Sequence, residues 1–233
     1  MIPETGAILV RSTGPVTLVG AGPATGADLA AALALAPEAV AADGGAGRAL
    51  PGGRRFRAVI GDLDSLEPSV AAAIRAEGIP LHRVAEQDTT DLEKCLYSVA
   101  APLIIGVGFL GGRIDHELAA LSALLRFADR PVVLLGRGEL CFALPPALDL
   151  DLAAGTRVSI FPLAPVTGLA ASGLRWNTAG LTLAPGARIG TSNEATGGPV
   201  RLAFDRPGAL MILPAACLPP VVAQLRETGA NRV

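Results

Sequence analysis

The sequence is poor in aromatic residues and carries almost no net charge. Aromatic residues make up 3% of the 233 residues, and the formal net charge is −2. A surface that binds nucleic acid needs clustered positive charge, and binding of single strands also uses aromatic side chains on which the bases stack. We therefore expect no nucleic-acid partner.

Cysteine pairs and long apolar runs are also missing. Cys95, Cys141 and Cys217 are odd in number, widely spaced and without a CxxC pair, so neither a disulfide framework nor a zinc site is predicted. The first residues lack a basic region that leads into an apolar core, and charged residues, Pro or Gly interrupt every apolar run before a bilayer-spanning length. We expect a cytoplasmic protein that is neither exported nor embedded in a membrane.

The chain is rich in small and aliphatic residues. It is 51% hydrophobic and 17% charged, so a globular protein with a core of Ala, Leu, Val and Ile is expected rather than a disordered chain. Its length allows one large domain or two modest ones.

Residues 1–145 alternate between strand and helix patterns. This alternation predicts an α/β domain with a Rossmann-like, mostly parallel sheet and helices on both faces. Ligands of such sheets bind beyond the carboxyl ends of the strands. The predicted strands are Val16–Val19, Ala39–Ala42, Phe56–Ile60, Leu81–Val84, Leu103–Val107 and Val132–Leu135, and the predicted helices are Ala27–Ala36, Ser69–Glu77, Asp91–Ala100 and Ile114–Ala128.

The pattern changes after Pro145-Pro146. Short β-like runs separated by turn residues predict a C-terminal antiparallel β-sandwich over residues 146–218, followed by a C-terminal tail, 219–233, that is helical after Pro220. Asp149–Asp151, with the two prolines, is interpreted as a linker. The predicted strands of this domain are Arg157–Leu163, Gly168–Trp176, Leu181–Leu183, Val200–Phe204 and Ala209–Leu213.

Acidic residues concentrate between Gly61 and Lys94. Asp62 and Asp64 directly follow a predicted strand, and Asp88 and Asp91 open a segment of helical spacing. Two like charges about 4 Å apart repel by roughly 4 kcal/mol at an effective dielectric near 20, so a cluster of carboxylates needs a cation within it. Oxygen ligands without Cys or His favour Mg²⁺.

Lys94 is the only lysine of the chain, and the other basic residues among its 19 Lys and Arg are all Arg. A compact ammonium beside the acids suits contact with a phosphate. The alternative is that Thr90 and Glu93 form a capping box and that Lys94 is a solvated residue of the first helical turn. The two interpretations can coexist.

Three glycine-rich turns invite different interpretations. Gly20–Gly26 has the spacing GxGxxxG and Gly106–Gly111 the spacing GxGxxG, which is either a dinucleotide fingerprint or a sharp turn between strand and helix. Neither run ends in the GK[ST] of a P-loop. Gly111 and Gly112, followed by Arg113, predict a helix start whose N–H groups hold phosphate. Asp115 is either part of that site or a first-turn acid that favours the helix dipole.

Six blocks of residues, in order along nearly the whole chain, resemble the signature of the thiamin pyrophosphokinase family. The family's aromatic residue between the paired aspartates is replaced by Leu63, a change that should alter packing rather than metal binding. The blocks are Asp43-Gly44-Gly45, Gly61–Ser65, Gln87–Lys94, Gly111–His116, Gly173–Trp176 and Thr191–Glu194.

The resemblance implies a transferase, thiamin diphosphokinase, that uses Mg²⁺ and moves the pyrophosphoryl group of ATP to thiamin, giving thiamin diphosphate and AMP. It also implies that residues 1–145 form the nucleotide-binding catalytic domain and residues 146–218 the thiamin-binding domain, in a homodimer with active sites at the subunit interface. Asp62, Asp64 and Asp91 would bind Mg²⁺, directly or through water. Gln87, Lys94 and Arg113 would hold the phosphates, and the same site would include Asp88, Gly111 and Gly112. Asp43, Gly44 and Gly45 would lie near the nucleotide. Asp115, Ser192 and Asn193 would contact thiamin.

Trp176, the only Trp, would stack on the cationic substrate or else fill the core of the sandwich. Three other functions stay open at this point. One is a pyrophosphokinase for another heterocyclic alcohol, such as a hydroxymethylpterin, and another is a noncatalytic regulator that binds nucleotide or thiamin. The third is a nicotinamide-dependent oxidoreductase built on Gly20–Gly26.

Overall fold

The computed structural model describes residues 7–230, so residues 1–6 of the first predicted domain and residues 231–233 of the predicted tail lie outside the described residues. The chain divides into two compact units. Unit 1 comprises Met1–Ala123 with Leu134–Arg137, and unit 2 comprises Leu124–Val133 with Gly138–Val233. The domain boundaries at residues 145 and 218 stay predictions.

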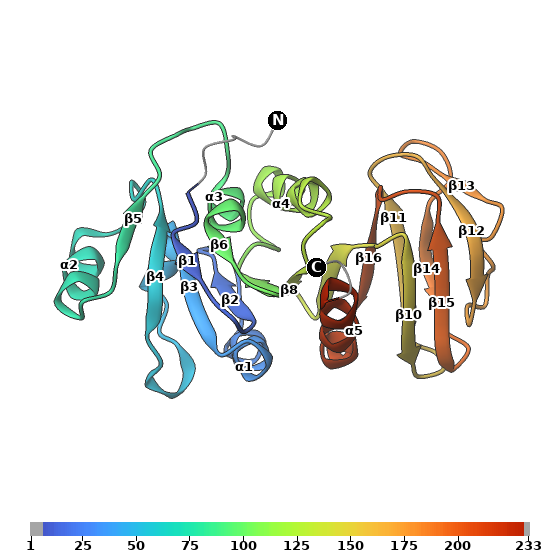
Figure 1. Ribbon diagram of the computed structural model, residues 1–233, viewed down its shortest axis with the longest axis horizontal. Helices are drawn as coiled ribbons and strands as arrows, with labels where there is room; N and C mark the ends of the chain where they lie inside the picture. The colour runs from blue at the N-terminus through green and yellow to red at the C-terminus, as the bar shows by residue number, and fades with distance from the viewer. Residues whose placement is uncertain (1–6, 231–233) are drawn as a thin grey trace. The chain divides into compact units, whose positions relative to one another are not determined.

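Unit 1 is built on a parallel sheet (Figure 1). Its strands lie in the order β5-β4-β3-β2-β7, with β8 next to β7, and β2 pairs in parallel with both β3 and β7. The chain therefore runs outward from β2 to β5 and then returns to the other side of β2. The strands are β2 (Val16–Val19), β3 (Glu38–Ala42), β4 (Phe56–Gly61), β5 (Leu81–Arg83), β7 (Ile104–Val107) and β8 (Val132–Gly136).

A reversal of strand order opens a crevice between the carboxyl ends of the two strands that flank it, here β2 and β7. The central strands are mostly apolar because both faces of a parallel sheet are covered; every residue of β2 and of β7 is buried, Thr17 included. Two short strands, β1 (Val10–Arg11) and β6 (Val99–Ala100), pair with each other in parallel.

The helices of unit 1 begin at residues suited to start them. Thr25 and Asp28 form a capping box at α1, and Thr90 and Glu93 form another at α3. Pro68 occupies the first turn of α2, where its missing N–H is not needed. The helical elements are α1 (Gly26–Leu35), α2 (Pro68–Ala76), α3 (Asp91–Ser98), α4 (Ile114–Arg126) and the short turns η1 (Asp43–Gly47) and η2 (Pro51–Gly53).

Unit 2 consists of antiparallel strands in two groups. One group has the order β14-β11-β16-β9 and the other the order β10-β15-β12-β13. The strands are β9 (Glu139–Ala143), β10 (Ala147–Leu152), β11 (Arg157–Pro162), β12 (Val166–Ser172), β13 (Thr182–Leu183), β14 (Gly190–Glu194), β15 (Gly198–Phe204) and β16 (Ala209–Pro214).

The predicted linker at Asp149–Asp151 is wrong. These residues lie in β10, in which Leu148, Leu150 and Leu152 are buried while the residues between them are exposed. That alternation has the period of a half-buried strand. The prolines precede the strand, where they cost no ladder hydrogen bond.

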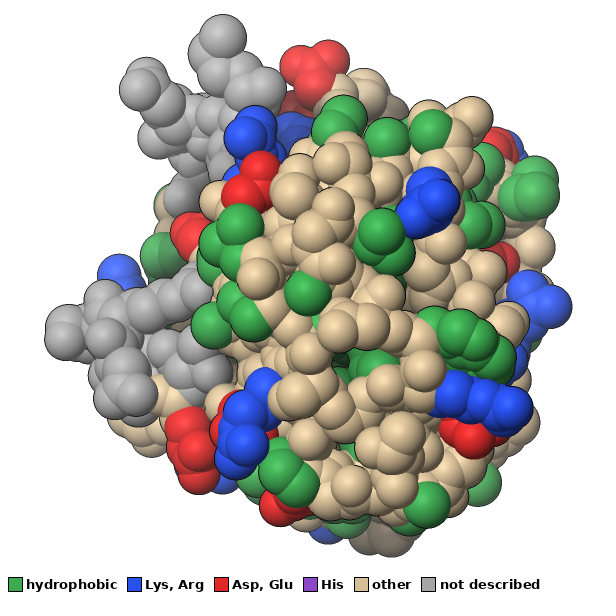
Figure 2. Space-filling view, turned by 90° about the vertical axis from the view of Figure 1, so that its right-hand side faces the viewer, with side chains coloured by type: hydrophobic (Ala, Val, Ile, Leu, Met, Phe, Trp, Pro, Cys, Tyr) green, Lys and Arg blue, Asp and Glu red, His purple; other side chains and the backbone are tan. Residues whose placement is uncertain are grey.

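The closing helix, α5 (Leu218–Ala230), follows the turn η3 (Ala215–Cys217) and packs against β10. It begins three residues earlier than predicted, because Pro219 and Pro220 are tolerated in a first helical turn. Figure 2 shows basic side chains beside acidic ones on the face in view, with hydrophobic side chains scattered among them.

The predicted fold class is confirmed: a largely parallel sheet with helices is followed by antiparallel sheets. Strands β9 and β14 were not predicted, and α3 ends at Ser98, two residues before the predicted end, where the chain enters β6. Within residues 7–230, no helix combines the length and the apolar character needed to cross a bilayer.

Candidate active site

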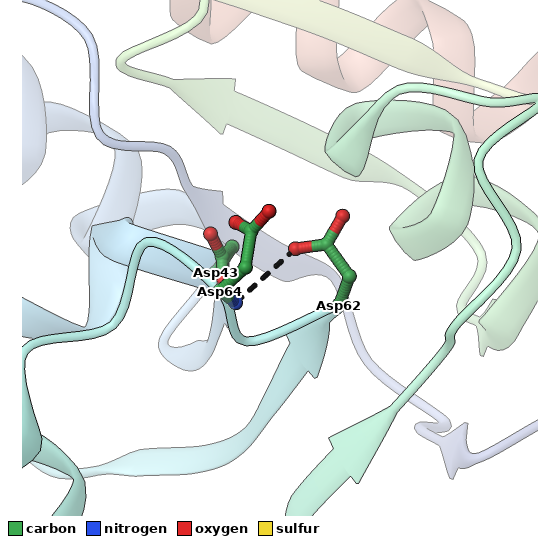
Figure 3. Close-up of side chains that lie close together, drawn as sticks. All are labelled: Asp43, Asp62 and Asp64. Carbon is green, nitrogen blue, oxygen red and sulfur yellow. Dashed lines mark hydrogen bonds between the residues drawn. The ribbon is translucent and has the colours of Figure 1, made fainter.

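Three carboxylates converge at the carboxyl edge of the parallel sheet. Oxygens of Asp43, Asp62 and Asp64 lie within 4.8 Å of one another. Asp43 follows β3, and Asp62 and Asp64 follow β4, the neighbouring strand. Figure 3 shows the three carboxyl groups turned to the same side of the loop after β4. Neighbouring parallel strands thus bring together acids that are 19 residues apart in the sequence.

Unfavourable backbone conformations hold these acids in place. Asp43 has a φ of 42° and Leu63 a φ of 64°, in the left-handed region that residues other than glycine rarely adopt. The turn at Leu63 lets the N–H of Asp64 donate to Oδ1 of Asp62 at 3.3 Å. Such conformations cost about 1–3 kcal/mol each and concentrate at functional sites, so their presence here supports a site rather than a loop of no function.

Glycines permit the close approach of β3 and β4 behind the acids. A Cβ on Gly61 would lie 2.7 Å from the Cβ of Asp43, and a Cβ on Gly45 would lie 2.0 Å from the carbonyl oxygen of Val19. A Cβ on Gly44 would lie 3.0 Å from Oγ of Ser65, which donates a hydrogen bond to Asp43. Gly44 and Gly45 therefore serve packing around Asp43.

Lys94 is buried at the centre of the acidic residues. Its side chain is only 2% exposed, and its ammonium lies 2.9 Å from Oδ2 of Asp62 and 3.6 Å from Oδ1 of Asp91. The capping box of Thr90 and Glu93 is present as well, so that prediction is confirmed. The interpretation of Lys94 as a solvated residue is wrong, because α3 points this side chain into the unit and toward β4.

The charges of these residues displace one another's pKa values. The hydrogen bond from Lys94 lowers the pKa of Asp62, although burial opposes the shift. The hydrogen bond and the negative charge of Asp62 raise the pKa of Asp64. Burial, together with the charge of Asp43, raises the pKa of Asp91. Burial lowers the pKa of Lys94, but the hydrogen bond to Asp62 and the nearby acids outweigh it, and the net shift is upward.

One ammonium does not neutralise this group of acids. Among the described residues, the buried Oδ1 of Asp43 has no hydrogen-bond partner, and a carboxylate oxygen of Asp43 lies within 4.8 Å of oxygens of Asp62 and Asp64. A buried oxygen without a partner, in a set made only of hard oxygen donors, fits a divalent cation such as Mg²⁺. Asp43, placed near the nucleotide by sequence, belongs to this closest group of acids.

A cavity of about 810 Å³ opens at the carboxyl ends of β2 and β7, next to the acids that follow β3 and β4. It brings together Asp43, Gly44, Asp62, Asp64, Gln87, Asp91, Lys94, Gly112 and Arg113 of the predicted site residues. Asp88, Gly45, Gly111 and Asp115 do not line it. Its remaining wall includes Gly20, Ala21, Gly22, Ser65, Thr89, Thr90, Gly108, Phe109, His116 and Glu117.

The glycine runs after β2 and β7 form one wall of the cavity by packing against each other. A Cβ on Gly20 would lie 2.6 Å from the carbonyl oxygen of Gly108, and the N–H of Gly22 donates to that same oxygen at 2.9 Å. Arg48 donates to the carbonyl oxygens of this loop, including that of Gly20 at 3.0 Å. The close approach of the two backbones thus explains the glycines of both runs without a dinucleotide fingerprint.

The start of α4 offers one guanidinium to the cavity. Arg113 pairs with Asp115 at 2.6 Å, and both side chains are exposed. The hydrogen bond from Arg113 lowers the pKa of Asp115 to about 2. The N–H of Gly111 donates to Glu117 at 3.0 Å, so it is already used within the turn. Glu117, which sequence reasoning missed, anchors the turn that carries Arg113.

In unit 2, the predicted thiamin contacts gather around Trp176. Its side chain is 53% exposed, so it is not a core aromatic. The guanidinium of Arg175 lies over its ring, 4.9 Å from the centroid. Asn193 is 5% exposed; its Oδ1 accepts from the N–H of Trp176 at 3.1 Å, and its Nδ2 donates to the carbonyl of Trp176 at 2.7 Å.

Ser192 is an exposed residue next to Asn193, with a φ of 61°. Its N–H donates to Oγ of Ser159 at 3.0 Å. Asn193 thus uses its amide to hold the backbone of Trp176, while Ser192 keeps its hydroxyl at the surface. These contacts lie within unit 2, and those of the acids lie within unit 1.

Comparison with known proteins joins these two sets of residues to one family. The family model described as thiamin pyrophosphokinase, catalytic domain, matches residues 30–134. The model described as thiamin pyrophosphokinase, vitamin B1 binding domain, matches residues 147–208. The matched ranges contain the acids, Lys94 and Trp176.

Individual relatives agree. The chain is 31% identical to thiamine pyrophosphokinase 3 of Oryza sativa over 185 residues, which cover 66% of this chain and 69% of that protein. It is similar to the solved structure of thiamin pyrophosphokinase from Geobacillus thermodenitrificans, with a TM-score of 0.71 and 25% identity over 86% of this chain and 96% of that one. For yeast thiamin pyrophosphokinase the TM-score is 0.75 at 15% identity, over 97% and 92% of the two chains, a likeness of fold.

Proposed function

Because the chain belongs to the thiamin pyrophosphokinase family and is an enzyme of that activity, we propose a division of roles between the residues of its two units. In the proposed reaction, the hydroxyl oxygen of thiamin forms a bond to the β-phosphorus of ATP and loses its proton to water. The bond from that phosphorus to the oxygen that stays with the α-phosphate breaks, and AMP leaves. Such a transfer depends mainly on positioning and on neutralisation of phosphate charge.

We assign Asp43, Asp62 and Asp64 to a Mg²⁺ site, with Asp91 as a further ligand directly or through water. The unpartnered oxygen of Asp43 and the short separation of the three carboxylates support this assignment. A bound Mg²⁺ would neutralise phosphate charge and fix the polyphosphate chain. Lys94 keeps Asp62 ionised and in place, since burial leaves its ammonium in contact with carboxylates.

Three groups then face the phosphates. Gln87 lines the cavity with an amide 3.4 Å from Oδ2 of Asp62, and Arg113 presents an exposed guanidinium at the start of α4. Gly112 contributes backbone at the same turn, while Asp88 and Gly111 act through the shape of their loops. Asp115 holds Arg113, and its lowered pKa makes it a weak base, so it suits orienting the hydroxyl of thiamin better than removing its proton.

Thiamin is a cation, and Trp176 offers an exposed indole face for it. A cation–π contact of this kind contributes about 0.5–2 kcal/mol. Ser192 offers its hydroxyl to the aminopyrimidine, and Asn193 acts by holding Trp176 rather than by touching substrate. We further propose that the protein acts as a homodimer, in which the aromatic site of one subunit serves the acidic site of the other.

The observation that carries this proposal is the convergence of three carboxylates, one of which has a buried oxygen without a partner among the described residues, in a chain with both family domains. Incubation with Mg-ATP and thiamin, followed by product identification, tests it. Thiamin diphosphate and AMP should form in equal amounts. Formation of ADP would indicate transfer of a single phosphoryl group and would overturn the proposal. Sedimentation analysis would test the homodimer.

A further inference from the structure

Glu86 lies in the loop between β5 and α3 and is saturated with hydrogen bonds. One carboxylate oxygen accepts from the N–H of Asp88 at 2.7 Å and from the N–H of Thr89 at 3.0 Å. The other accepts from the hydroxyl of Tyr97 at 2.9 Å and from the hydroxyl of Thr89. A carboxylate has about four acceptor positions, and here all four are used.

These bonds tie together two parts of the chain that border the cavity. Residues 84–90 form no helix or strand, so backbone groups in this loop lack the partners that regular structure supplies. Tyr97, the only Tyr of the chain, lies two turns into α3, the helix that carries Asp91 and Lys94. Glu86 therefore fixes the loop to the helix at a point beyond the helix N-terminus.

The loop that Glu86 fixes bears directly on the acidic site. Gln87, the next residue, donates from Nε2 to Oδ2 of Asp62 at 3.4 Å, and the same oxygen accepts from Lys94. Thr89 and Thr90 line the cavity, whereas Glu86 does not. A shift of the loop would therefore move Gln87 away from Asp62 and displace two residues of the cavity wall, without loss of any group that lines it.

We propose that Glu86 and Tyr97 form a positioning clamp that sets the loop of Gln87 and the helix of Lys94 relative to each other for the Mg-ATP half of the reaction. The clamp acts through Gln87, Asp62 and Lys94 and touches no substrate. The expected effect on kinetics rests on the proposed function. The expected effect on the structure of the loop rests on the hydrogen bonds alone.

The test compares Glu86→Gln, Tyr97→Phe and the double variant with the full-length wild type. In Glu86→Gln an amide NH₂ replaces one acceptor oxygen, so one pair of donors loses its partner. We expect kcat/KM for Mg-ATP to fall roughly tenfold or more, the size expected for hydrogen bonds to a charged group, with KM for thiamin unchanged within about twofold. Hydrogen exchange at the amides of Asp88 and Thr89 should accelerate by a similar factor.

Tyr97→Phe removes one donor and should give a smaller change of the same kind. Because both variants break one clamp, the double variant should lose much less than the product of the two single losses. Glu77→Gln is the matched control. Glu77 is an exposed acid that pairs with Arg55 at 3.5 Å, and neither residue lines the cavity. It should keep wild-type kinetics and wild-type exchange.

Several outcomes would overturn the clamp. One is a wild-type rate of hydrogen exchange at the amides of Asp88 and Thr89 in Glu86→Gln. Another is exchange accelerated throughout unit 1, or an equal fall of kcat/KM for Mg-ATP and for thiamin, because either result indicates general destabilisation. If Glu86→Gln does not fold, Tyr97→Phe decides by the same measurements. A wild type that forms no AMP would refute the proposed function, while the exchange data would still test the hydrogen bonds.

Discussion

Unit 1 and unit 2 build their functional surfaces in opposite ways. In unit 1, parallel strand ends bring carboxylate oxygens of Asp43, Asp62 and Asp64 within 4.8 Å of one another, and a buried Lys94 pairs with Asp62. In unit 2, Trp176 is left on the surface and a single buried amide, that of Asn193, holds its backbone from behind. The surface of unit 1 therefore depends on several charged side chains held close together, and that of unit 2 on one side chain whose backbone is held in place.

The difference predicts how each region responds to substitution. Asp64 and Asp91, whose pKa values are raised, oppose folding when they are ionised, so removal of either should cost activity far more than stability. Asn193 satisfies partly buried backbone groups, so its removal should cost stability together with thiamin binding. The two regions are thereby separable by paired measurements of stability and kinetics.

The largest effect is expected for Asp62→Asn. The substitution removes a proposed metal ligand and the acid closest to the ammonium of Lys94, 2.9 Å away. We expect Mg²⁺-dependent formation of AMP to fall at least about 100-fold, the scale of losing an electrostatic contact in a transition state. Circular dichroism should show a folded protein. Activity near that of wild type would remove Asp62 from the site.

The next effect is expected for Asn193→Ala. The carbonyl and the N–H of Trp176 would both lose their partner, and unsatisfied buried groups cost about 1–3 kcal/mol. Urea unfolding should show this loss, and KM for thiamin should rise. Ser192→Ala is the matched control, since its exposed side chain can lose a hydroxyl without loss of stability. Equal stability of the two variants would contradict the holding role of Asn193.

Trp176→Ala should act on thiamin alone. The indole is 53% exposed, so the variant should unfold at the same urea concentration as wild type. Loss of a contact of about 0.5–2 kcal/mol should raise KM for thiamin roughly 2- to 30-fold, with KM for Mg-ATP unchanged. Because Trp176 is the only Trp, its fluorescence in the wild type should also respond to thiamin; an unchanged spectrum at saturation would rule out stacking.

The smallest effect is expected for Asp64→Asn without metal. The pKa of Asp64 is raised by its hydrogen bond with Asp62 and by that residue's charge. A folded-state pKa above the unfolded value disfavours folding at higher pH, and the penalty disappears as pH falls through that pKa. At about pH 7 the metal-free variant should therefore be at least as stable as wild type, a difference that vanishes near about pH 3.

Mg²⁺ should reverse the ranking. Wild type should gain stability on titration with Mg²⁺, because a ligand that binds only the folded state stabilises it, and Asp64→Asn should gain much less. Thermal unfolding with and without Mg²⁺ measures both effects. An equal gain in the two proteins would show that Asp64 is not a ligand.

Much of the fold could be read from local patterns. The strand Val16–Val19 was predicted with its observed bounds, since a short apolar run between turn residues has few alternatives. The Leu-Asp alternation of β10 was misread as a linker because the prolines beside it suggested a break. Strand β14 was missed, since Gly190–Glu194 has none of the apolar residues that mark a strand and pairs only through its backbone with β11.

The candidate site was predicted in its residue types but not in its arrangement. The sequence singled out Asp62, Asp64 and Asp91 by their position after a strand and before a helix, whereas the closest group in space includes Asp43. Glu86 gave no signal, because it lies outside any regular element and its role consists of hydrogen bonds to backbone groups. Only the folded loop reveals such a role.

The sequence by itself determined the alternation of strands and helices in residues 1–145, the capping box at Thr90 and the presence of one lysine near the acids, because each follows from residues close together in the chain. Tertiary structure alone decided that Lys94 is buried against Asp62, that Asp43 joins the acids and that Trp176 stays exposed. These properties depend on which strand ends are neighbours and which faces are covered, and contacts between distant residues fix both.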